Sequence, residues 1–249
     1  WGNWEAATQL IDKMLKREGI GAILAEGLHR APRLLGKEKG LSEEFAKITV
    51  HVKGSGINMH DWRPNSSILF GYIVAGTGPA HQGMGSDHRP NDEIGYPVMT
   101  PGVVHNLQEA LGKVDSVRKT QLCKLWWDSL GVCWFAVLGT THAVKSTAEA
   151  VRHAVGWDDF SDEEALRVGE RITNAMRLIY LKRGFKKSDE FDISPRYLER
   201  PSAGPASAGT IGPYVEAMVD EYYRQIGWDV ETGRPTREGL ERLGLSAFA

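Results

Sequence analysis

The sequence is poor in cysteine and lacks any long hydrophobic run. Its 249 residues contain two cysteines, Cys123 and Cys133, which excludes a disulfide scaffold and favours a reducing compartment, with a thiol left for metal binding or chemistry. The mean hydropathy is -0.33, and no apolar run reaches the length of about 18 residues that a membrane span needs. No signal-peptide pattern begins at Trp1. We therefore expect a cytoplasmic protein without a membrane partner.

An excess of charge of either sign is also missing. Thirty lysines and arginines stand against 32 acidic residues, for a formal charge of -2, and no block of like charge stands out. No nucleic-acid partner is expected, because nucleic acids are bound by clustered basic residues. The composition is ordinary for a globular protein, with 41% hydrophobic and 25% charged residues. Disorder, collagen and a coiled coil are thereby excluded.

Apolar residues at helical spacing predict a mainly α fold with at most one or two short strands. Cap signals at Asn3, Ser161 and Thr236 mark the starts of three helices. Pro32 is expected to break or kink the second helix. Residues 54–102 hold one apolar patch, Ile68 to Ala75, and otherwise read as long, functional loops. Residues 200–213 read as a linker or a surface coil. Helices are expected near residues 3–19, 21–35, 115–127, 161–179, 218–227 and 236–243, with a strand at 46–53.

The segment Asp128-Ser-Leu-Gly-Val-Cys133 carries the strongest chemical signal. Gly131 would let the backbone approach a ligand, the carboxylate can accept N–H bonds from a heterocycle, and a thiolate can bind a soft metal. In the structural alternative, a helix ends here and Cys133 is buried with the apolar residues up to Leu138. One cysteine is too few for a metal cluster, so further ligands would come from outside this chain.

Histidines in the long loop region are candidates for proton transfer. His81 lies on a glycine-rich turn and could approach a ligand, and imidazole transfers protons near neutral pH. His88 is a rival of similar standing, and for both a simple surface position stays open. A metal site is the weaker alternative, since the spacings match no tight ligand pattern. Its ligands would be His51, His60, His81 and His88.

Six segments carry a family resemblance through their fixed order along nearly the whole chain. They are Glu18-Gly-Ile-Gly-Ala-Ile-Leu-Ala-Glu-Gly27, His51-Val-Lys-Gly54 with Asp61-Trp-Arg63, Tyr72 to His81, Asp128 to Cys133, Arg183-Gly-Phe185, and the tail from Gly227-Trp-Asp229 through Gly233-Arg-Pro-Thr236 to Leu243-Gly-Leu245. Together they resemble the C-terminal portion of the tungsten-containing aldehyde ferredoxin oxidoreductases.

The resemblance implies a redox enzyme. Family members carry tungsten, or in a few cases molybdenum, on two pterin cofactors near a four-iron four-sulfur cluster. They oxidise aldehydes to carboxylic acids and pass the electrons to ferredoxin. By resemblance Asp128 accepts hydrogen bonds from one pterin, the backbone of Leu130, Gly131 and Val132 contacts the same ring system, and Cys133 is the last cluster ligand. His81 matches the histidine near the metal that takes part in proton transfer.

The resemblance covers about the last two-fifths of such an enzyme. It implies two helical domains, with residues 1–50 ending the middle domain and residues 51–249 forming the C-terminal domain with the cofactor-contact turn. The cysteine triplet that supplies the other cluster ligands is absent, so an N-terminal part is expected as a partner, and a homodimer is compatible with the resemblance. Two alternatives stay open: a tungsten enzyme of this family acting on an aromatic acyl-CoA, and a cofactor-free helical scaffold.

Overall fold

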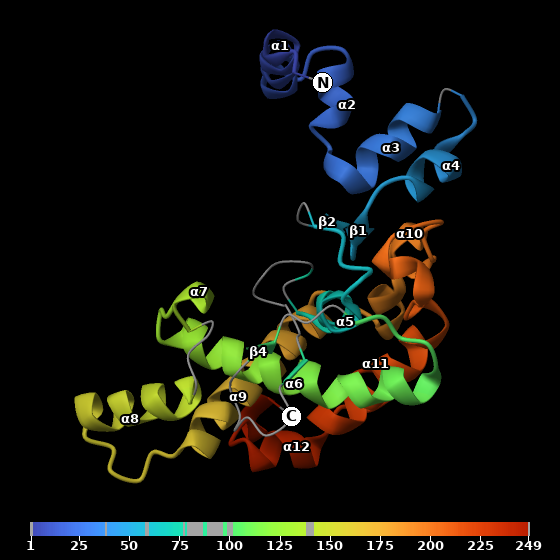
Figure 1. Ribbon diagram of the computed structural model, residues 1–249. Helices are drawn as coiled ribbons and strands as arrows, with labels where there is room; N and C mark the ends of the chain where they lie inside the picture. The colour runs from blue at the N-terminus through green and yellow to red at the C-terminus, as the bar shows by residue number, and fades with distance from the viewer. Residues whose placement is uncertain are drawn as a thin grey trace.

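Most of the chain is helical, and the helices form two parts (Figure 1). The structure is a computed structural model that describes residues 2–37, 39–57, 60–76, 78, 87–88, 97–98, 102–137 and 142–248. The N-terminal helices stand apart at the top of Figure 1, above a larger helical body formed by the middle and C-terminal residues. The expected mainly α fold is confirmed. No helix in the described ranges is both long and apolar enough to cross a membrane.

The N-terminal part consists of helices α1 (Trp4–Lys16), α2 (Ile20–Leu24), α3 (Gly27–Lys37) and α4 (Ser42–Lys47). The side chain of Asn3 caps α1 as predicted, accepting the N–H of Ala6 at 3.0 Å. The expected break at Pro32 is wrong, because Pro32 lies inside α3. The chain turns before α3 instead, where Gly27 adopts a φ of +79°, a conformation that glycine takes without strain.

Helix α1 carries an apolar stripe that stays uncovered within the described residues. Leu10, Ile11 and Leu15 are all exposed, and no residue of α1 is buried. The helix contacts the rest of the part through α2, where Gly21 lies so close to Lys13 that a Cβ would clash with its backbone. The spacing of these apolar residues is that of an amphipathic helix, but their side chains add nothing to the described core.

Two short hairpins are the only strand pairs among the described residues. Strands β1 (His51–Val52) and β2 (Ser55–Gly56) pair antiparallel, as do β3 (Asp87–His88) and β4 (Pro97–Val98). Four strands of two residues exceed the one or two expected, although the fold class is unaffected. The predicted strand at 46–53 is largely wrong, since the chain is helical up to Lys47. Fully buried Val52 bridges to Ile193, which ties β1 to the body.

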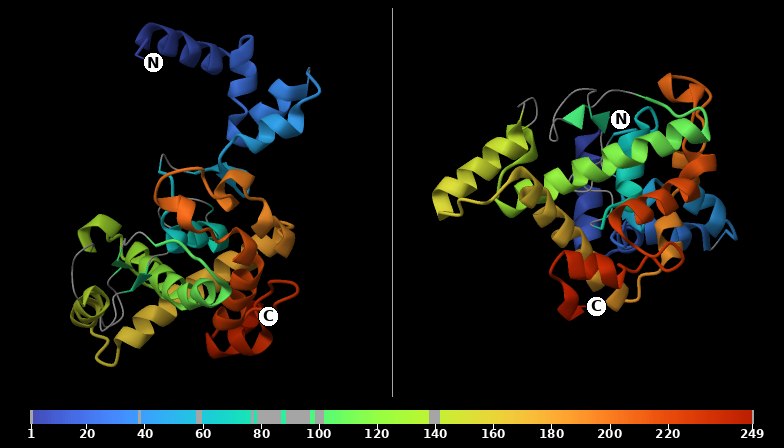
Figure 2. Two further views of the ribbon diagram at one scale, coloured as in Figure 1. Left: turned by 45° about the vertical axis from the view of Figure 1, so that its right-hand side comes forward. Right: turned by 90° about the horizontal axis from the view of Figure 1, so that it is seen from below.

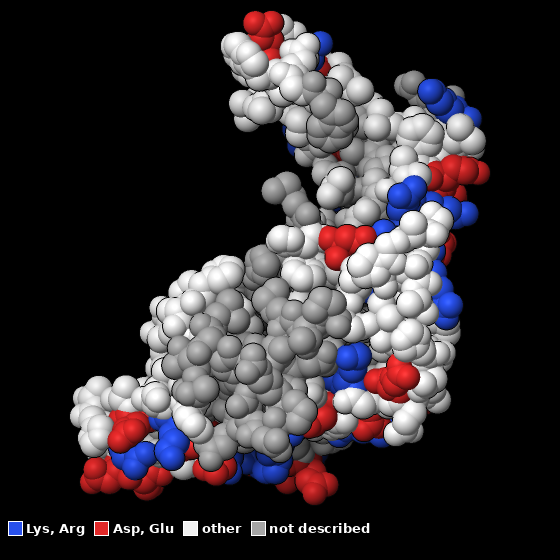
Figure 3. Space-filling view, viewed as in Figure 1, with Lys and Arg blue, Asp and Glu red and all other residues white. Residues whose placement is uncertain are grey.

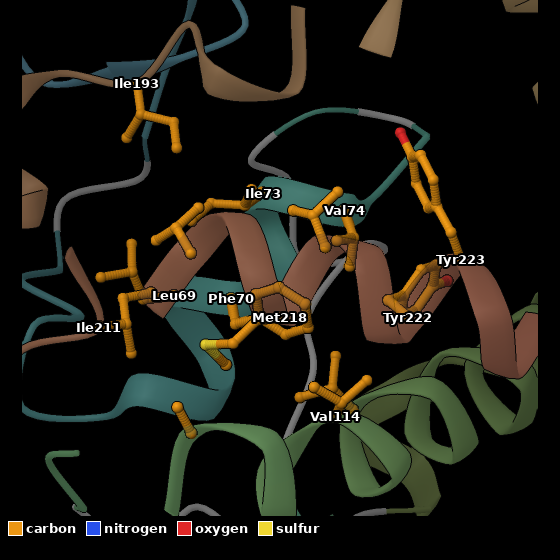
Figure 4. Close-up of a cluster of buried hydrophobic side chains, with 14 of the residues drawn as sticks. Leu69, Phe70, Ile73, Val74, Val114, Ile193, Ile211, Met218, Tyr222 and Tyr223 are labelled. Atoms are coloured by element: carbon orange, nitrogen blue, oxygen red, sulfur yellow. The ribbon is translucent and has the colours of Figure 1, made fainter. Parts of the chain in front are cut away.

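Helix α5 (Ser66–Val74) forms the centre of the body. All its residues are buried, as expected for a helix that is apolar on every side. It packs against α6 (Leu107–Ser129), α11 (Val215–Ile226) and the segment around Ile193. Figure 4 shows side chains of α5 meeting those of α6 and α11 in the main cluster. The labelled members are Leu69, Phe70, Ile73, Val74, Val114, Ile193, Ile211, Met218, Tyr222 and Tyr223.

A second cluster lies at the other end of α6, under α7 (Trp134–Val137) and α8 (Ala143–Val155). It contains Ile68 and Tyr72 from α5 together with Trp126, Trp127 and Trp134. The rings of Trp127 and Trp134 have centroids 5.7 Å apart. Both tryptophans of the pair in α6, Trp126 and Trp127, are therefore core residues.

The C-terminal segments wrap the body. Residues 200–213 form the expected surface coil, in which Ala206 and Ile211 are buried and the N–H of Thr210 donates to the carbonyl of Val104 at 3.0 Å. The predicted caps at Ser161 and Thr236 are confirmed by side-chain bonds to the N–H groups three residues ahead. The segments are α9 (Asp162–Lys182), η2 (Lys187–Phe191), α10 (Pro195–Leu198), η3 (Pro205–Ala208), η4 (Gly212–Tyr214), α12 (Arg237–Arg242) and η5 (Ser246–Phe248).

The surface agrees with the balanced charge of the sequence. Figure 3 shows acidic and basic side chains interspersed over the described part of the visible face. Figure 2 shows the same two parts from other directions, with the N-terminal helices reaching away from the body.

Close packing of α6 on α9 depends on one glycine. A Cβ added to Gly169 would lie 2.2 Å from the carbonyl oxygen of Leu122, so the helices would have to move apart. We expect Gly169→Ala to destabilise the chain by about 1–3 kcal/mol, measured by urea unfolding. The matched control is Gly112→Ala at an exposed position of α6, where a Cβ meets nothing within 4 Å, and a gain of about 0.5–1 kcal/mol is expected. Equal effects of the two substitutions would contradict this packing argument.

Candidate functional site

The turn after α6 is held closed by its own backbone. The N–H groups of Leu130 and Val132 donate to the carbonyl of Trp127 at 3.1 and 2.9 Å, and that of Gly131 donates to Asp128 at 3.1 Å. Gly131 has a φ of +71°, which favours glycine, and a Cβ there would meet nothing within 4 Å. Among the described residues, the turn therefore presents an unobstructed backbone face beside Gly131.

Asp128 lies at the C-terminal end of α6, where a carboxylate is disfavoured by the negative end of the helix dipole. Lys124, one turn earlier on the same helix, offsets this by pairing its Nζ with Oδ1 of Asp128. The lysine side chain is buried, whereas that of Asp128 is a third exposed. The ion pair thus orients the carboxylate on the surface of the turn.

The two cysteines differ sharply in their surroundings. Cys133 is exposed, whereas Cys123 is buried in α6, and burial raises the pKa of its thiol to about 12. The structural alternative for Cys133 is therefore wrong, as is the expected continuous burial of the segment after it. Helix α7 is amphipathic: Trp134 and Val137 are buried while Phe135 is exposed. Cys133 is thus the cysteine that can meet a ligand.

Of the four candidate histidines, His51 and His60 have described side chains. His81 lies outside the described residues, and so does the side chain of His88. Of the other two histidines in the weaker metal hypothesis, His60 packs against Trp62, whereas His51 lies beside His29 and Asp192. The proposed four-histidine set is therefore not assembled by the described residues.

A partly open cavity of about 260 Å³ lies in the body and was not predicted from the sequence. Gln121 and Leu125 of α6 line it, and Asp128 follows three residues later on the same helix. Residues three and four apart share one face of a helix, so cavity and turn lie along the same face of α6. Gly76 and Gly78, from which the chain leads towards His81, also line the cavity. The other lining residues are Lys53, Ser55, Val74, Ala75, Thr173, Met176, Arg177, Tyr180, Phe185, Tyr222 and Trp228.

A buried ion cluster forms one wall of this cavity. Glu190, which is 0% exposed, accepts from Arg177 Nη1 at 2.9 Å and lies 2.5 Å from Lys53 Nζ. Arg177 also donates to the hydroxyl of Tyr223 at 2.6 Å and to the carbonyl of Gly233 at 2.7 Å. Burial lowers the pKa of Lys53, and the neighbouring Glu190 opposes that shift. The cluster connects β1, α9, η2 and α11 around the cavity.

Comparison with known proteins matches nearly the whole chain to one family model. The family model described as "Aldehyde ferredoxin oxidoreductase, domains 2 & 3" matches residues 1–245. Tungsten-containing aldehyde ferredoxin oxidoreductases of Pyrococcus furiosus and Pyrococcus horikoshii are 32% and 35% identical over 253 and 252 residues. Each alignment covers the whole of this chain and 38% of the relative. The chain thus spans well under half the length of these relatives.

A solved structure shows the same fold. It is the active site complex BamBC of benzoyl coenzyme A reductase with 1,5-dienoyl-CoA, which matches with a TM-score of 0.68 at 18% identity. The match covers 100% of this chain and 40% of that one. At this identity the likeness supports the fold alone. With the family match over nearly the whole sequence, it leads to one conclusion: the chain belongs to the aldehyde ferredoxin oxidoreductase family, of which it matches domains 2 and 3.

Proposed function

We propose that this chain supplies one wall of a tungstopterin and iron–sulfur site in an enzyme that oxidises aldehydes to carboxylic acids, with ferredoxin as electron acceptor. The observation that carries the proposal is the exposed turn from Asp128 to Cys133, which continues the face of α6 that lines the cavity. A redox site for a small organic substrate needs a metal ligand, a hydrogen-bond acceptor for the cofactor and a cavity for the substrate. The thiolate of Cys133, the carboxylate of Asp128 and the apolar cavity would supply these along one face of α6.

The donor groups fit one edge of such a cofactor. Cys133 offers one thiolate, as a cluster completed by cysteines from another segment requires. Asp128 offers a carboxylate acceptor, and the open face at Gly131 leaves room for a flat ring system. The N–H groups of Leu130, Gly131 and Val132 are already used within the turn, so their contact with a ring would be through van der Waals packing and carbonyl groups. When bound, the metal centre would supply the two-electron redox chemistry.

The cavity residues would hold the organic part of the substrate. Met176, Tyr180 and Phe185 give the cavity an apolar and aromatic lining, which favours a hydrophobic aldehyde and keeps water away from it. His81 follows Gly78 by three residues, and its imidazole would orient the substrate carbonyl or accept a proton. The side chains of α9 and of the residues after it would thus select the substrate by the size and shape of its hydrocarbon part.

The test is a substrate assay on the complete enzyme, purified without oxygen from cells grown with tungstate. We expect bound tungsten and iron, and reduction of ferredoxin with aldehydes. A second candidate reaction is reduction of an aromatic acyl-CoA, the class of compound named for the solved structure that shares this fold. Turnover with acyl-CoA esters and none with aldehydes would replace the first reaction by the second. A protein without tungsten or iron would overturn both and favour the scaffold.

Replacement of His81 by alanine tests the proton-transfer role. We expect turnover to fall by about 10²–10⁴-fold, the usual contribution of a positioned acid–base group, while tungsten content is unchanged. His88→Ala is the matched control, because it removes a histidine from the same loop region, and near-normal turnover is expected. Normal turnover of the His81 variant would assign that residue no part in the reaction.

A further inference from the structure

Three side chains that can bind a metal ion meet where the N-terminal part joins the body. His29 comes from α3, His51 from β1, and Asp192 directly follows η2. Their ligand atoms all lie within 4.8 Å of one another. His29 Nε2 is 3.7 Å from one carboxylate oxygen of Asp192, and His51 Nδ1 is 4.0 Å from the other. Donors from three separate segments thus converge on one point.

The innermost of these ligand atoms is buried without a hydrogen bond. The side chain of His51 is 4% exposed, and its Nδ1 has no hydrogen-bond partner in the described structure. A buried nitrogen without a partner destabilises the folded chain, and a bound ion would remove that cost. Burial lowers the pKa of His51 more than the charge of Asp192 raises it, which favours the neutral ring. A neutral imidazole is the form that ligates metals.

The backbone fixes two of the three ligands in advance. The N–H of Ser194 donates to the carbonyl of His51 at 2.9 Å, and the N–H of Lys53 donates to that of Asp192 at 2.7 Å. The ring of His29 approaches that of His51 edge-on, with centroids 5.0 Å apart. A rigid pair on the body therefore faces a third ligand carried by α3.

We propose that His29, His51 and Asp192 bind a zinc ion that fastens α3 to the body. Two imidazoles and one carboxylate are a common zinc donor set, with a fourth position left for water. Ligands about 2.1 Å from a tetrahedral zinc are about 3.4 Å apart, so modest side-chain movement closes the site. The side chains of His29 and Asp192 are 34% and 41% exposed, which lets the ion enter from solvent. In Figure 1 the N-terminal helices join the body near β1, the strand that carries His51.

Zinc binding by the purified protein tests the proposal. After treatment with a chelator, the protein is dialysed against zinc alone and the bound metal is counted. We expect one zinc ion per chain at this site, and affinity at least about tenfold weaker in His29→Ala and Asp192→Asn, because each removes a ligand. The matched control is His153→Ala, which removes an exposed histidine 3.9 Å from Glu149 where a third ligand is not found among the described residues.

Stability gives a second measurement on the same proteins. Zinc is expected to raise the melting temperature of the wild type and of His153→Ala, but not that of His29→Ala. The site is independent of the proposed redox function, so Cys133→Ala should leave zinc binding unchanged. The inference is overturned if no zinc binds, or if zinc binds equally well to the His29 and Asp192 variants. Circular dichroism without metal verifies that these partly exposed substitutions leave the fold intact.

Discussion

Glu190→Gln is expected to destabilise the chain by about 3–5 kcal/mol. The glutamate is 0% exposed and lies between two buried cations, accepting from Arg177 at 2.9 Å and lying 2.5 Å from Lys53. Glutamine keeps the size of the side chain but removes the only carboxylate that these two cations share in the described structure. Breaking a buried ion pair from one side leaves charge without compensation, which costs more than the pair itself contributes.

Urea unfolding followed by circular dichroism measures this effect. The matched control is Glu241→Gln, because Glu241 pairs with Arg237 at 2.9 Å and both side chains are exposed. Exposed pairs contribute about 0–1 kcal/mol, so this variant should unfold nearly as the wild type does. A loss below about 1 kcal/mol for Glu190→Gln would show that Lys53 loses its proton or that water enters the cavity wall. The ion cluster would then not be what holds β1, α9 and α11 together.

Local signals in the sequence were enough for α6, α9, α11 and α12, whereas α5, α7, α8 and α10 were not predicted. Ser161 and Thr236 cap helices because their side chains satisfy N–H groups three residues ahead. The same reasoning failed at Pro32 and at residues 46–53, where contacts with distant parts of the chain determine the secondary structure. Pro32 is buried inside α3, and only His51 and Val52 become strand because Val52 bridges to Ile193, far away in the chain. A bridge of that kind has no local signature.

The candidate site was predictable only where it is local. The turn from Asp128 to Cys133 is a contiguous segment, so its residue types and its glycine were visible in the sequence. The ion cluster joins Lys53, Arg177 and Glu190, and these charged residues have no shared spacing. The same holds for His29 and Asp192, which meet His51 only through the fold. Only the structure reveals these two groups of residues. The ion cluster is recognised by the buried charge of Glu190, and the histidine site by the Nδ1 of His51, which is unpaired among the described residues.

Cys133→Ala in the complete enzyme is expected to remove the iron–sulfur cluster and with it the activity. The sulfur is exposed at the end of a turn that three backbone hydrogen bonds hold closed, so the substitution leaves the backbone unchanged. Loss of residues that merely orient metal ligands costs about 10–100-fold in affinity or activity, and loss of a ligand itself should cost more. Iron analysis and ferredoxin reduction measure the two effects.

Cys123→Ala is the matched control for this experiment. It removes the other cysteine of the chain, one that is 1% exposed and has a thiol pKa raised by burial to about 12, so it cannot offer a thiolate near neutral pH. Iron content and turnover should therefore stay close to those of the wild type, apart from a small loss of stability. If the Cys133 variant keeps its full iron content, the cluster is bound by other residues. In that case the turn after α6 would serve the pterin alone, and Asp128→Asn would be the substitution that lowers tungsten content.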